Sequence, residues 1–147
     1  MDHAVKLTIN GETREFPMGI TYKEVVKEYE KTSPAPVILV IAGGKICELH
    51  KKAERDGEVR LVTTKDSIGN KTYKRTACLV LLKAIYDLAG KEKVDKVVLH
   101  YSVGSGFYFT MEGEQKLDQA FLDQVKKRMT ELVEQKIPVK KRSVGTD

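Results

Sequence analysis

The chain has 147 residues, 41% hydrophobic and 32% charged, which is typical of a globular protein with one ordinary domain or two small ones. No segment approaches the ~18 uninterrupted apolar residues of a transmembrane helix, so we expect a soluble protein with no membrane partner. The net charge of +5 comes entirely from residues 67–147, because residues 1–66 carry 11 basic and 11 acidic side chains. This asymmetry fits a polyanionic partner for the second half, and equally well simple solubility.

The cysteines and the N-terminus indicate a reducing compartment. Cys47 and Cys78 lie in separate apolar segments, so no disulfide framework is expected. The first residues run directly into a strand pattern and lack the apolar core of a signal peptide. We therefore expect a cytoplasmic protein.

The first half of the chain predicts a small sheet that packs on one helix. Asn10-Gly11 is a strong hairpin-turn signal, and Thr21 with Glu24 forms a capping-box pattern at a helix start. A continuous apolar run at residues 37–41 is typical of a central strand buried on both faces. The predicted order is β-β-α-β-β-β, over residues 4–9, 12–16, 22–30, 37–41, 45–49 and 58–63.

This order of elements, with the Asn10-Gly11, Gly43-Gly44 and Asp56-Gly57 turns, resembles the TGS domain. TGS domains are ubiquitin-like β-grasp modules of threonyl-tRNA synthetases and of certain GTPases and stringent-response enzymes. The resemblance covers residues 4–64 and implies a TGS-like β-grasp domain over residues 1–65. A resemblance of fold does not by itself assign a function.

The second half predicts a long helix, a hairpin, a second helix and a basic strand, over residues 70–88, 96–111, 119–135 and 139–144. Apolar residues in the long helix are so frequent that little polar face remains, and we expect this helix to be buried on most sides. Asp118 is placed to cap the second helix, and Pro138 ends its pattern.

The long helix, the hairpin ending in Gly106-Phe107-Tyr108-Phe109 and the following helix are similar to the second N-terminal domain of threonyl- and alanyl-tRNA synthetases. In that family the helix opens with two histidines, four residues apart, that serve a metal-assisted editing hydrolysis. The matching positions here are Arg75 and Leu79, and neither side chain can replace a neutral imidazole. The resemblance implies an α+β fold in which residues 66–147 are the N-terminal part of such a domain, cut near its midpoint.

A variant of this domain pair, with both histidines lost, precedes the kinase domain of bacterial uridine-kinase-like nucleoside kinases. Residues 66–76 and 103–109 look most like that group. Our leading expectation is therefore a non-catalytic, ligand- or nucleic-acid-binding regulatory region of such a kinase, which transfers the ATP phosphate to a nucleoside. ATP and Mg²⁺ would belong to the downstream kinase domain, which would be this region's partner, and no cofactor is expected in the region itself.

Two other hypotheses remain. The chain is alternatively the tRNA-binding N-terminal region of a threonyl-tRNA synthetase-like protein whose editing activity is lost, or a region that still hydrolyses mischarged tRNA. No phosphate-binding-loop motif occurs, and Gly104-x-Gly106 reads as a hairpin turn, so no catalytic residue is predicted. His3, His50 and His100 are scattered and no Cys or His lies at ligand spacing, so no metal site is predicted.

Three sets of residues are candidates for binding. Basic side chains near the start of the long helix form either a phosphate or RNA site or a solvated face. Polar and aromatic residues of the hairpin form either a remnant of a nucleoside or threonine pocket or an ordinary strand surface. A basic run near the C-terminus either contacts phosphates or blocks an exposed strand edge. The sets are Lys71, Lys74 and Arg75; His100, Tyr101, Ser102 and Tyr108; and Lys140, Lys141 and Arg142.

Overall fold

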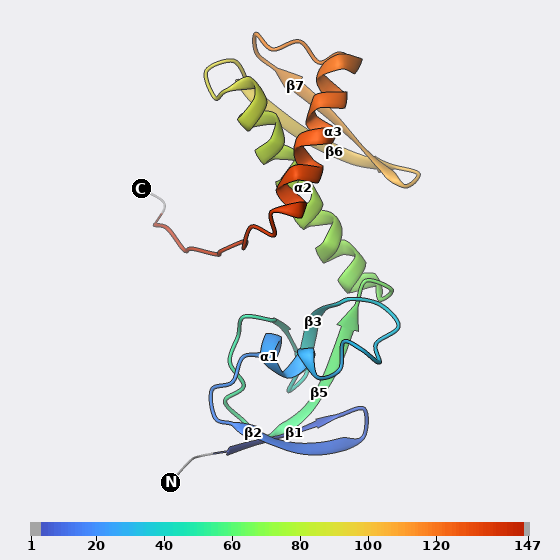
Figure 1. Ribbon diagram of the computed structural model, residues 1–147, viewed down its shortest axis with the longest axis vertical. Helices are drawn as coiled ribbons and strands as arrows, with labels where there is room; N and C mark the ends of the chain where they lie inside the picture. Colours follow the sequence, from blue (N-terminus) through green and yellow to red (C-terminus); the bar gives the residue numbers. More distant parts are fainter. Residues whose placement is uncertain (1–3, 146–147) are drawn as a thin grey trace. The chain divides into compact units, whose positions relative to one another are not determined.

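A computed structural model describes residues 4–145 and shows an α+β protein, which confirms the predicted fold class (Figure 1). The chain forms two compact units, Met1–Thr76 and Ala77–Asp147. The division falls within helix α2 (Ser67–Ala89), which contributes to both units. The sequence-based domain boundary between residues 65 and 66, just before α2, stays a prediction.

The first unit contains a five-stranded mixed sheet and one short helix. Its elements are β1 (Ala4–Ile9), β2 (Glu12–Pro17), α1 (Tyr22–Lys27), β3 (Val37–Ala42), β4 (Lys45–Glu48) and β5 (Gly57–Thr63). The strand order is β2-β1-β5-β3-β4, with β1 parallel to β5 and every other neighbouring pair antiparallel. This is the β-grasp arrangement that the order of elements predicts.

Local chemistry explains the turns and the helix start of this unit. Asn10 and Gly11 have positive φ angles of 53° and 82°, as a two-residue hairpin turn requires. The Thr21 side chain accepts a hydrogen bond from the Glu24 N–H, and the Glu24 carboxylate accepts one from the Thr21 N–H, which completes the predicted capping box. The helix ends earlier than predicted because the N–H groups of Glu28 and Tyr29 bond to carbonyls only three residues back.

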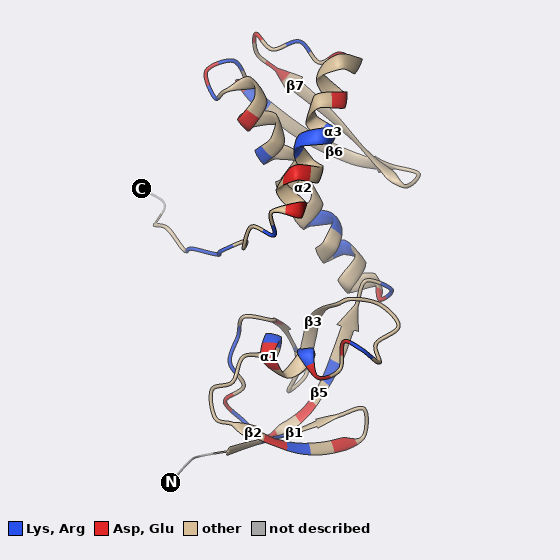
Figure 2. Cartoon of the chain, viewed as in Figure 1, with Lys and Arg blue, Asp and Glu red and all other residues tan. Residues whose placement is uncertain are grey.

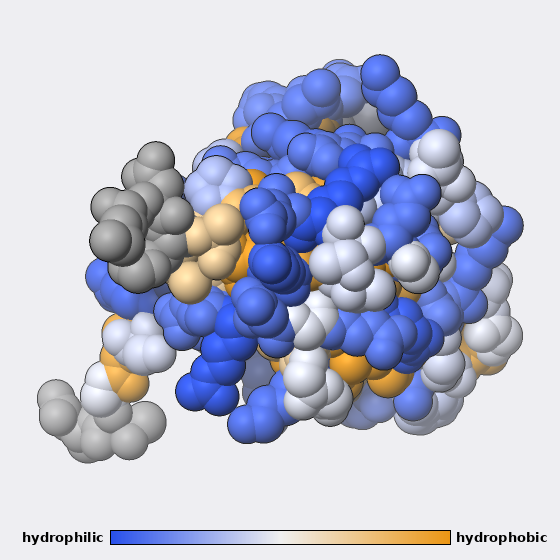
Figure 3. All heavy atoms as spheres, turned by 90° about the horizontal axis from the view of Figure 1, so that it is seen from below, coloured by the Kyte–Doolittle hydropathy of each residue, from blue (hydrophilic) through white to orange (hydrophobic). Residues whose placement is uncertain are grey.

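The core of the first unit lies between α1 and the sheet. Apolar side chains of β1, α1, β3 and β5 are almost fully buried, among them Val5, Leu7, Val25 and Val40. Strand β3 is interior to the sheet, as predicted, although Ile38 and Ile41 are only partly buried. Hydrophilic side chains cover most of the molecular face shown in Figure 3, where hydrophobic ones appear only in small patches.

Helix α2 is joined tightly to the end of β5. The Asp66 carboxylate accepts hydrogen bonds from the Thr63 N–H at 2.7 Å and the Thr63 hydroxyl at 3.1 Å. These bonds hold the pKa of Asp66 below its usual value. One turn later, Gly69 lies against the Thr63 carbonyl so closely that no side chain fits between them. The first turn of α2 is therefore attached to the end of β5 by short-range contacts.

The prediction that this long helix is buried on most sides is wrong. Ala84, Ile85 and Ala89 are buried, but Tyr73 is 56% and Leu79 is 55% exposed. The apolar side chains that pack on α2 come from α3 and the hairpin, and their cluster includes residues of α2 only from Val80 onward. The earlier turns of the helix carry apolar side chains with no comparable cover among the described residues.

The second unit packs two helices on one face of a hairpin (Figure 1). Its further elements are β6 (Lys96–Val103), β7 (Gly106–Glu112) and α3 (Gln119–Glu134). The Asp118 carboxylate accepts a hydrogen bond from the Phe121 N–H at 2.9 Å, which confirms the predicted cap. Phe121, Val125 and Leu132 of α3 meet Ile85 of α2 in the core.

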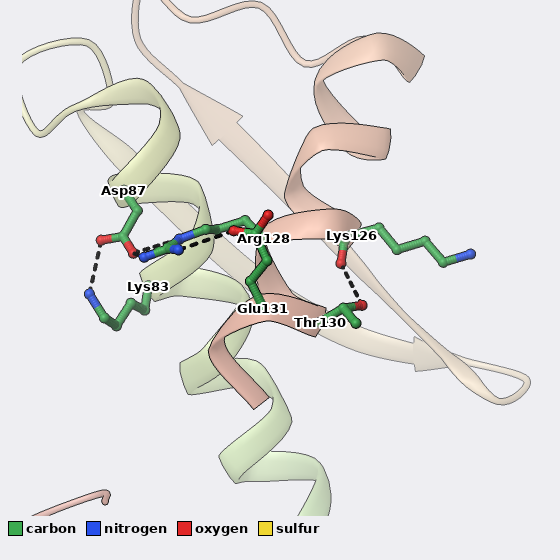
Figure 4. A network of polar contacts seen from close by, with 6 residues as sticks. All are labelled: Lys83, Asp87, Lys126, Arg128, Thr130 and Glu131. Atoms are coloured by element: carbon green, nitrogen blue, oxygen red, sulfur yellow. Dashed lines mark hydrogen bonds and ion pairs between the residues drawn. The ribbon is translucent and has the colours of Figure 1, made fainter. Parts of the chain in front are cut away.

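A network of charged side chains ties α3 to α2 (Figure 4). The Asp87 carboxylate accepts hydrogen bonds from the Lys83 ammonium at 2.9 Å and from two guanidinium nitrogens of Arg128 at 2.9 and 3.1 Å. Arg128 also contacts Glu131 at 3.2 Å. The bonds from Lys83 and then Arg128 hold the pKa of Asp87 below its usual value. This carboxylate therefore favours the folded state most when it is ionised.

We expect Asp87→Asn to lower the melting temperature at pH 7 by about 4 °C, because Lys83 and Arg128 both lose their ion pair with Asp87. The pKa of Asp87 is lower in the folded chain than in the unfolded one, so its contribution is present above pH ~4 and is lost as the pH falls through the folded-state value. The variant should consequently lose less stability than the parent between pH 6 and pH 3, as followed by circular dichroism. Asp123→Asn, at an exposed carboxylate of α3, is the control; an equal effect there would contradict the assignment.

The prediction of a basic strand over residues 139–144 is also wrong. Helix α3 ends at Glu134 with Gln135 as its C-cap, and Lys136 adopts a positive φ of 50° that turns the chain out of the helix. The segment from 137 to 145 has no regular secondary structure. A strand needs a neighbour for its backbone hydrogen bonds, and none of the described strands pairs with this segment. Within residues 4–145, no helix is both long and apolar enough to span a membrane.

Candidate nucleic-acid interface

The early turns of α2 present a basic face. Lys71 and Arg75 are exposed and Lys74 is half-buried, and the helical spacing places them on adjoining positions of one side. None of the three makes an ion pair with a residue in the described part of the chain. No acidic residue occurs from Ser67 to Tyr86, and Figure 2 shows blue bands without red along these turns. These cations are therefore free to meet an anion from outside.

An exposed aromatic ring accompanies these cations. Tyr73 lies between Lys71 and Lys74 in sequence and is 56% exposed. The hydroxyls of Thr72 and Thr76 donate hydrogen bonds to backbone carbonyls one turn back in the helix, at 3.0 and 3.3 Å. Cations that touch phosphates, together with rings that can stack, are the side chains that nucleic-acid-binding surfaces use. The helical spacing turns Tyr73 away from Lys71 and Arg75, so the cations by themselves form the face that suits a polyanion lying along the helix.

The hairpin brings three of its four predicted residues together. Tyr101 pairs with Tyr108 across the two strands, and their ring centroids are 5.4 Å apart. The His100 ring lies 5.2 Å from Tyr108 and 6.5 Å from Tyr101. The fourth residue, Ser102, pairs with Phe107 on the other face of the hairpin, so it is not part of this ring cluster. We use "ring cluster" for His100, Tyr101 and Tyr108.

A β-bulge creates the ring cluster. Leu99 pairs with Phe109 and Tyr101 with Tyr108, so two steps along β6 match one step along β7 and His100 is the extra residue. Phe109 packs toward the helices, and therefore Tyr108 and its partner Tyr101 lie on the outer face. The sequence alone did not reveal this bulge, because the apolar alternation of β6 reads as an unbroken strand.

The C-terminal basic run lies in the irregular segment that follows α3. Lys140, Lys141 and Arg142 are all exposed there. Because this segment is not a strand, the interpretation that the run blocks a strand edge is wrong. The run belongs to the second unit together with the ring cluster, whereas Lys71, Lys74 and Arg75 belong to the first.

The positions that match the editing histidines of the synthetase resemblance are not equipped for metal binding. Arg75 and Leu79 are both exposed on α2. Across residues 4–145, no three or more His, Cys, Asp or Glu side chains are grouped so that they could hold a metal ion.

Comparison with known proteins indicates which kind of protein this chain resembles. No family model matches the chain. It is 26% identical over 139 residues to the threonine–tRNA ligase of Thermotoga petrophila and 25% identical over 138 residues to that of Carboxydothermus hydrogenoformans, which is 94% of this chain in both cases. The threonine–tRNA ligase of Caldanaerobacter subterraneus is 28% identical over 86% of the chain.

These relatives correct the leading expectation from the sequence. They are threonine–tRNA ligases, and none of those given above is a uridine kinase or a nucleoside kinase, so the expectation of a kinase regulatory region is wrong. The synthetase-like alternative agrees with them better. The chain spans about a fifth of the length of the ligases it matches, 21% for the Thermotoga and Carboxydothermus proteins. Over most of its own length, this chain is thus similar to one part of threonine–tRNA ligases.

Proposed function

We propose that this chain is the tRNA-binding N-terminal region of a threonyl-tRNA synthetase-like protein, with Lys71, Lys74 and Arg75 on the tRNA phosphates. In this proposal the first unit is a TGS domain and the second is part of a synthetase-like second domain. The similarity to threonine–tRNA ligases over 94% of the chain supports the assignment of the family. Residues Lys140 to Arg142 are a second, weaker candidate for phosphate contact.

The observation that carries the proposal is the unpaired basic face of α2. Surface lysines and arginines usually lie near acidic neighbours that offset their charge, as Lys83 does with Asp87 one turn away. The earlier turns have no such neighbours on the helix, and their charges repel one another. A phosphate backbone would remove this repulsion and would release counterions when it binds.

The proposal includes the loss of editing hydrolysis. The guanidinium of Arg75 only donates hydrogen bonds, and the side chain of Leu79 offers no ligand at all. Neither can bind a metal ion or accept a proton, as a neutral imidazole can. Arg75 is instead available for phosphate contact, which would turn a hydrolytic position into a binding position.

Salt-dependent binding of tRNA tests the proposal. We expect the affinity for threonine tRNA to fall steeply with salt, and the double variant Lys71→Glu with Arg75→Glu to reduce the logarithmic salt slope by about 2 and the affinity at low salt by at least about tenfold. Fluorescence anisotropy between 50 and 300 mM salt measures both quantities. The control is Lys31→Glu with Lys51→Glu, which changes the net charge equally at exposed sites of the same unit.

Two results would contradict the proposal. One is binding that is absent or insensitive to salt, and the other is an equal loss in the control variant, which would mean that net charge alone matters. The editing part is tested with the same protein and mischarged seryl-tRNA in the presence of Zn²⁺. Release of serine above the spontaneous rate would show that hydrolysis is retained.

A further inference from the structure

We propose that the ring cluster His100, Tyr101 and Tyr108 is a stacking platform for an unpaired nucleobase. This inference rests on the proposed binding of nucleic acid and deepens it, since it names single-stranded nucleotides as the part that this unit recognises. Three features of the hairpin support it: the geometry of the rings, the bulge that brings them together, and the charge of the surface around them.

The three rings lie close together and remain open, but they do not share one plane, because the planes of His100 and Tyr101 are inclined by 63°. Tyr101 is 62% and Tyr108 is 46% exposed, although their centroids are only 5.4 Å apart. The planes of Tyr101 and His100 are inclined to that of Tyr108 by 32° and 34°, so no ring fully covers the face of another. His100 is also anchored, because its Nε2 shares a 2.8 Å hydrogen bond with the Thr110 hydroxyl. A planar base can therefore stack on the exposed face of Tyr101 or Tyr108, beside the anchored His100.

The bulge exposes the ring of Tyr101, which a regular strand would bury. We take this exposure as a sign that the ring has a function at the surface. In a regular strand, Tyr101 would share the face of Leu99 and point toward the helices. The extra residue His100 reverses this alternation, so the ring of Tyr101 turns outward. A buried tyrosine would contribute more to stability than an exposed one, because burial of its apolar area is favourable. Bulges that re-aim side chains in this way are frequent beside functional sites.

The surroundings of the ring cluster carry no charge that would repel the phosphates of a nucleotide. From Val97 to Met111 the hairpin carries no acidic and no basic residue, and His100 is its only titratable group besides the tyrosines. Figure 2 accordingly shows a tan hairpin between its charged ends. Phosphates on either side of a stacked base meet no negative charge there. Base stacking on aromatic side chains contributes in every sequence context, because each base has a π face.

The test compares two probes with equal phosphates, an eight-nucleotide oligoadenylate and an abasic oligomer of the same length. We expect the chain to bind the oligoadenylate about tenfold more tightly, and Tyr101→Ala or Tyr108→Ala to reduce this ratio to nearly one. Tyr101→Phe should preserve the ratio, since stacking does not need the hydroxyl. Val103→Ala is the matched control, because Val103 lies on the same outer face and is 61% exposed but has no ring.

The readouts separate this inference from the proposed function. Tyr101→Ala should leave the salt slope of tRNA binding unchanged, whereas Lys71→Glu should change the slope and leave the base-to-abasic ratio intact. Equal binding of both probes by the parent, or a ratio that survives Tyr101→Ala or Tyr108→Ala in a folded variant, would overturn the stacking platform. Self-association of the parent would also overturn the stacking platform if sedimentation showed that Tyr101→Ala abolishes it. A second copy of the chain, and not a nucleobase, would then occupy the ring cluster.

Discussion

Ile85→Ala is expected to destabilise the second unit by about 2 to 5 kcal/mol. Ile85 is fully buried among Phe121, Val125 and Leu132 of α3, and the substitution would leave a cavity that these side chains cannot fill without moving. A unit of this size has little stability to spare. Urea denaturation followed by circular dichroism measures the loss, and amide hydrogen exchange shows in which unit it occurs.

Leu79→Ala is the matched control on the same helix. Leu79 is 55% exposed, so we expect a change within about 0.5 kcal/mol. The pair tests the finding that α2 is covered only along its later turns. If Leu79→Ala were as damaging as Ile85→Ala, Leu79 would be packed against something in solution and the described exposure of the helix would be contradicted.

Gly69→Ala is expected to destabilise the first unit by about 2 kcal/mol, the reverse of the usual effect in a helix. Alanine normally stabilises a helix relative to glycine by about 1 kcal/mol. Here its Cβ would overlap the Thr63 carbonyl oxygen and lie 2.8 Å from the Thr63 carbonyl carbon. Both atoms belong to the backbone at the end of β5, so relief requires the helix to move and the bonds between Asp66 and Thr63 to weaken.

Asn70→Ala is the control for this prediction, because Asn70 is the next residue of the same turn and is exposed. Its replacement should be neutral or slightly stabilising. Thermal melts of the two variants give the comparison directly. A stabilised Gly69→Ala variant would mean that α2 does not leave the sheet through the contact with Thr63.

The correction of the functional hypothesis has a specific cause. The loss of both histidine positions, at Arg75 and Leu79, and the sequence around them favoured a kinase-associated variant of the synthetase-like domain. The similarity that covers 94% of the chain is to threonine–tRNA ligases. Substitution of two site residues changes the chemistry of a domain but not the proteins to which its whole sequence is similar. The absence of the two histidines therefore bears on editing activity and does not indicate the family.

The sequence alone identified one candidate site fully and the other only in part. The basic residues of α2 could be found from helical spacing, because that spacing alone places Lys71, Lys74 and Arg75 on one side. The hairpin residues were named from their position opposite Phe107 and Tyr108, but their grouping depends on the bulge at His100. That bulge turns Tyr101 to the outer face, where it pairs with Tyr108, and it leaves Ser102 on the opposite face.

The sequence by itself determined the features whose causes lie within a few residues. Asn10-Gly11 specifies its turn through positive φ angles, Thr21 and Glu24 cap α1 with their own side chains, and Asp118 caps α3. With the hydrophobic pattern, these signals suffice for the order of elements as far as α3 and for the α+β class.

Only the tertiary structure decided which apolar residues of α2 are buried, where β6 bulges, and that the chain after α3 is not a strand. Leu79 and Ile85 are equally hydrophobic, and they differ only in whether another element packs over them. The segment after Pro138 has strand-like composition, but it lacks a neighbour for its hydrogen bonds among the described strands. Burial and strand pairing are properties of two surfaces that meet, so one segment's pattern cannot determine them.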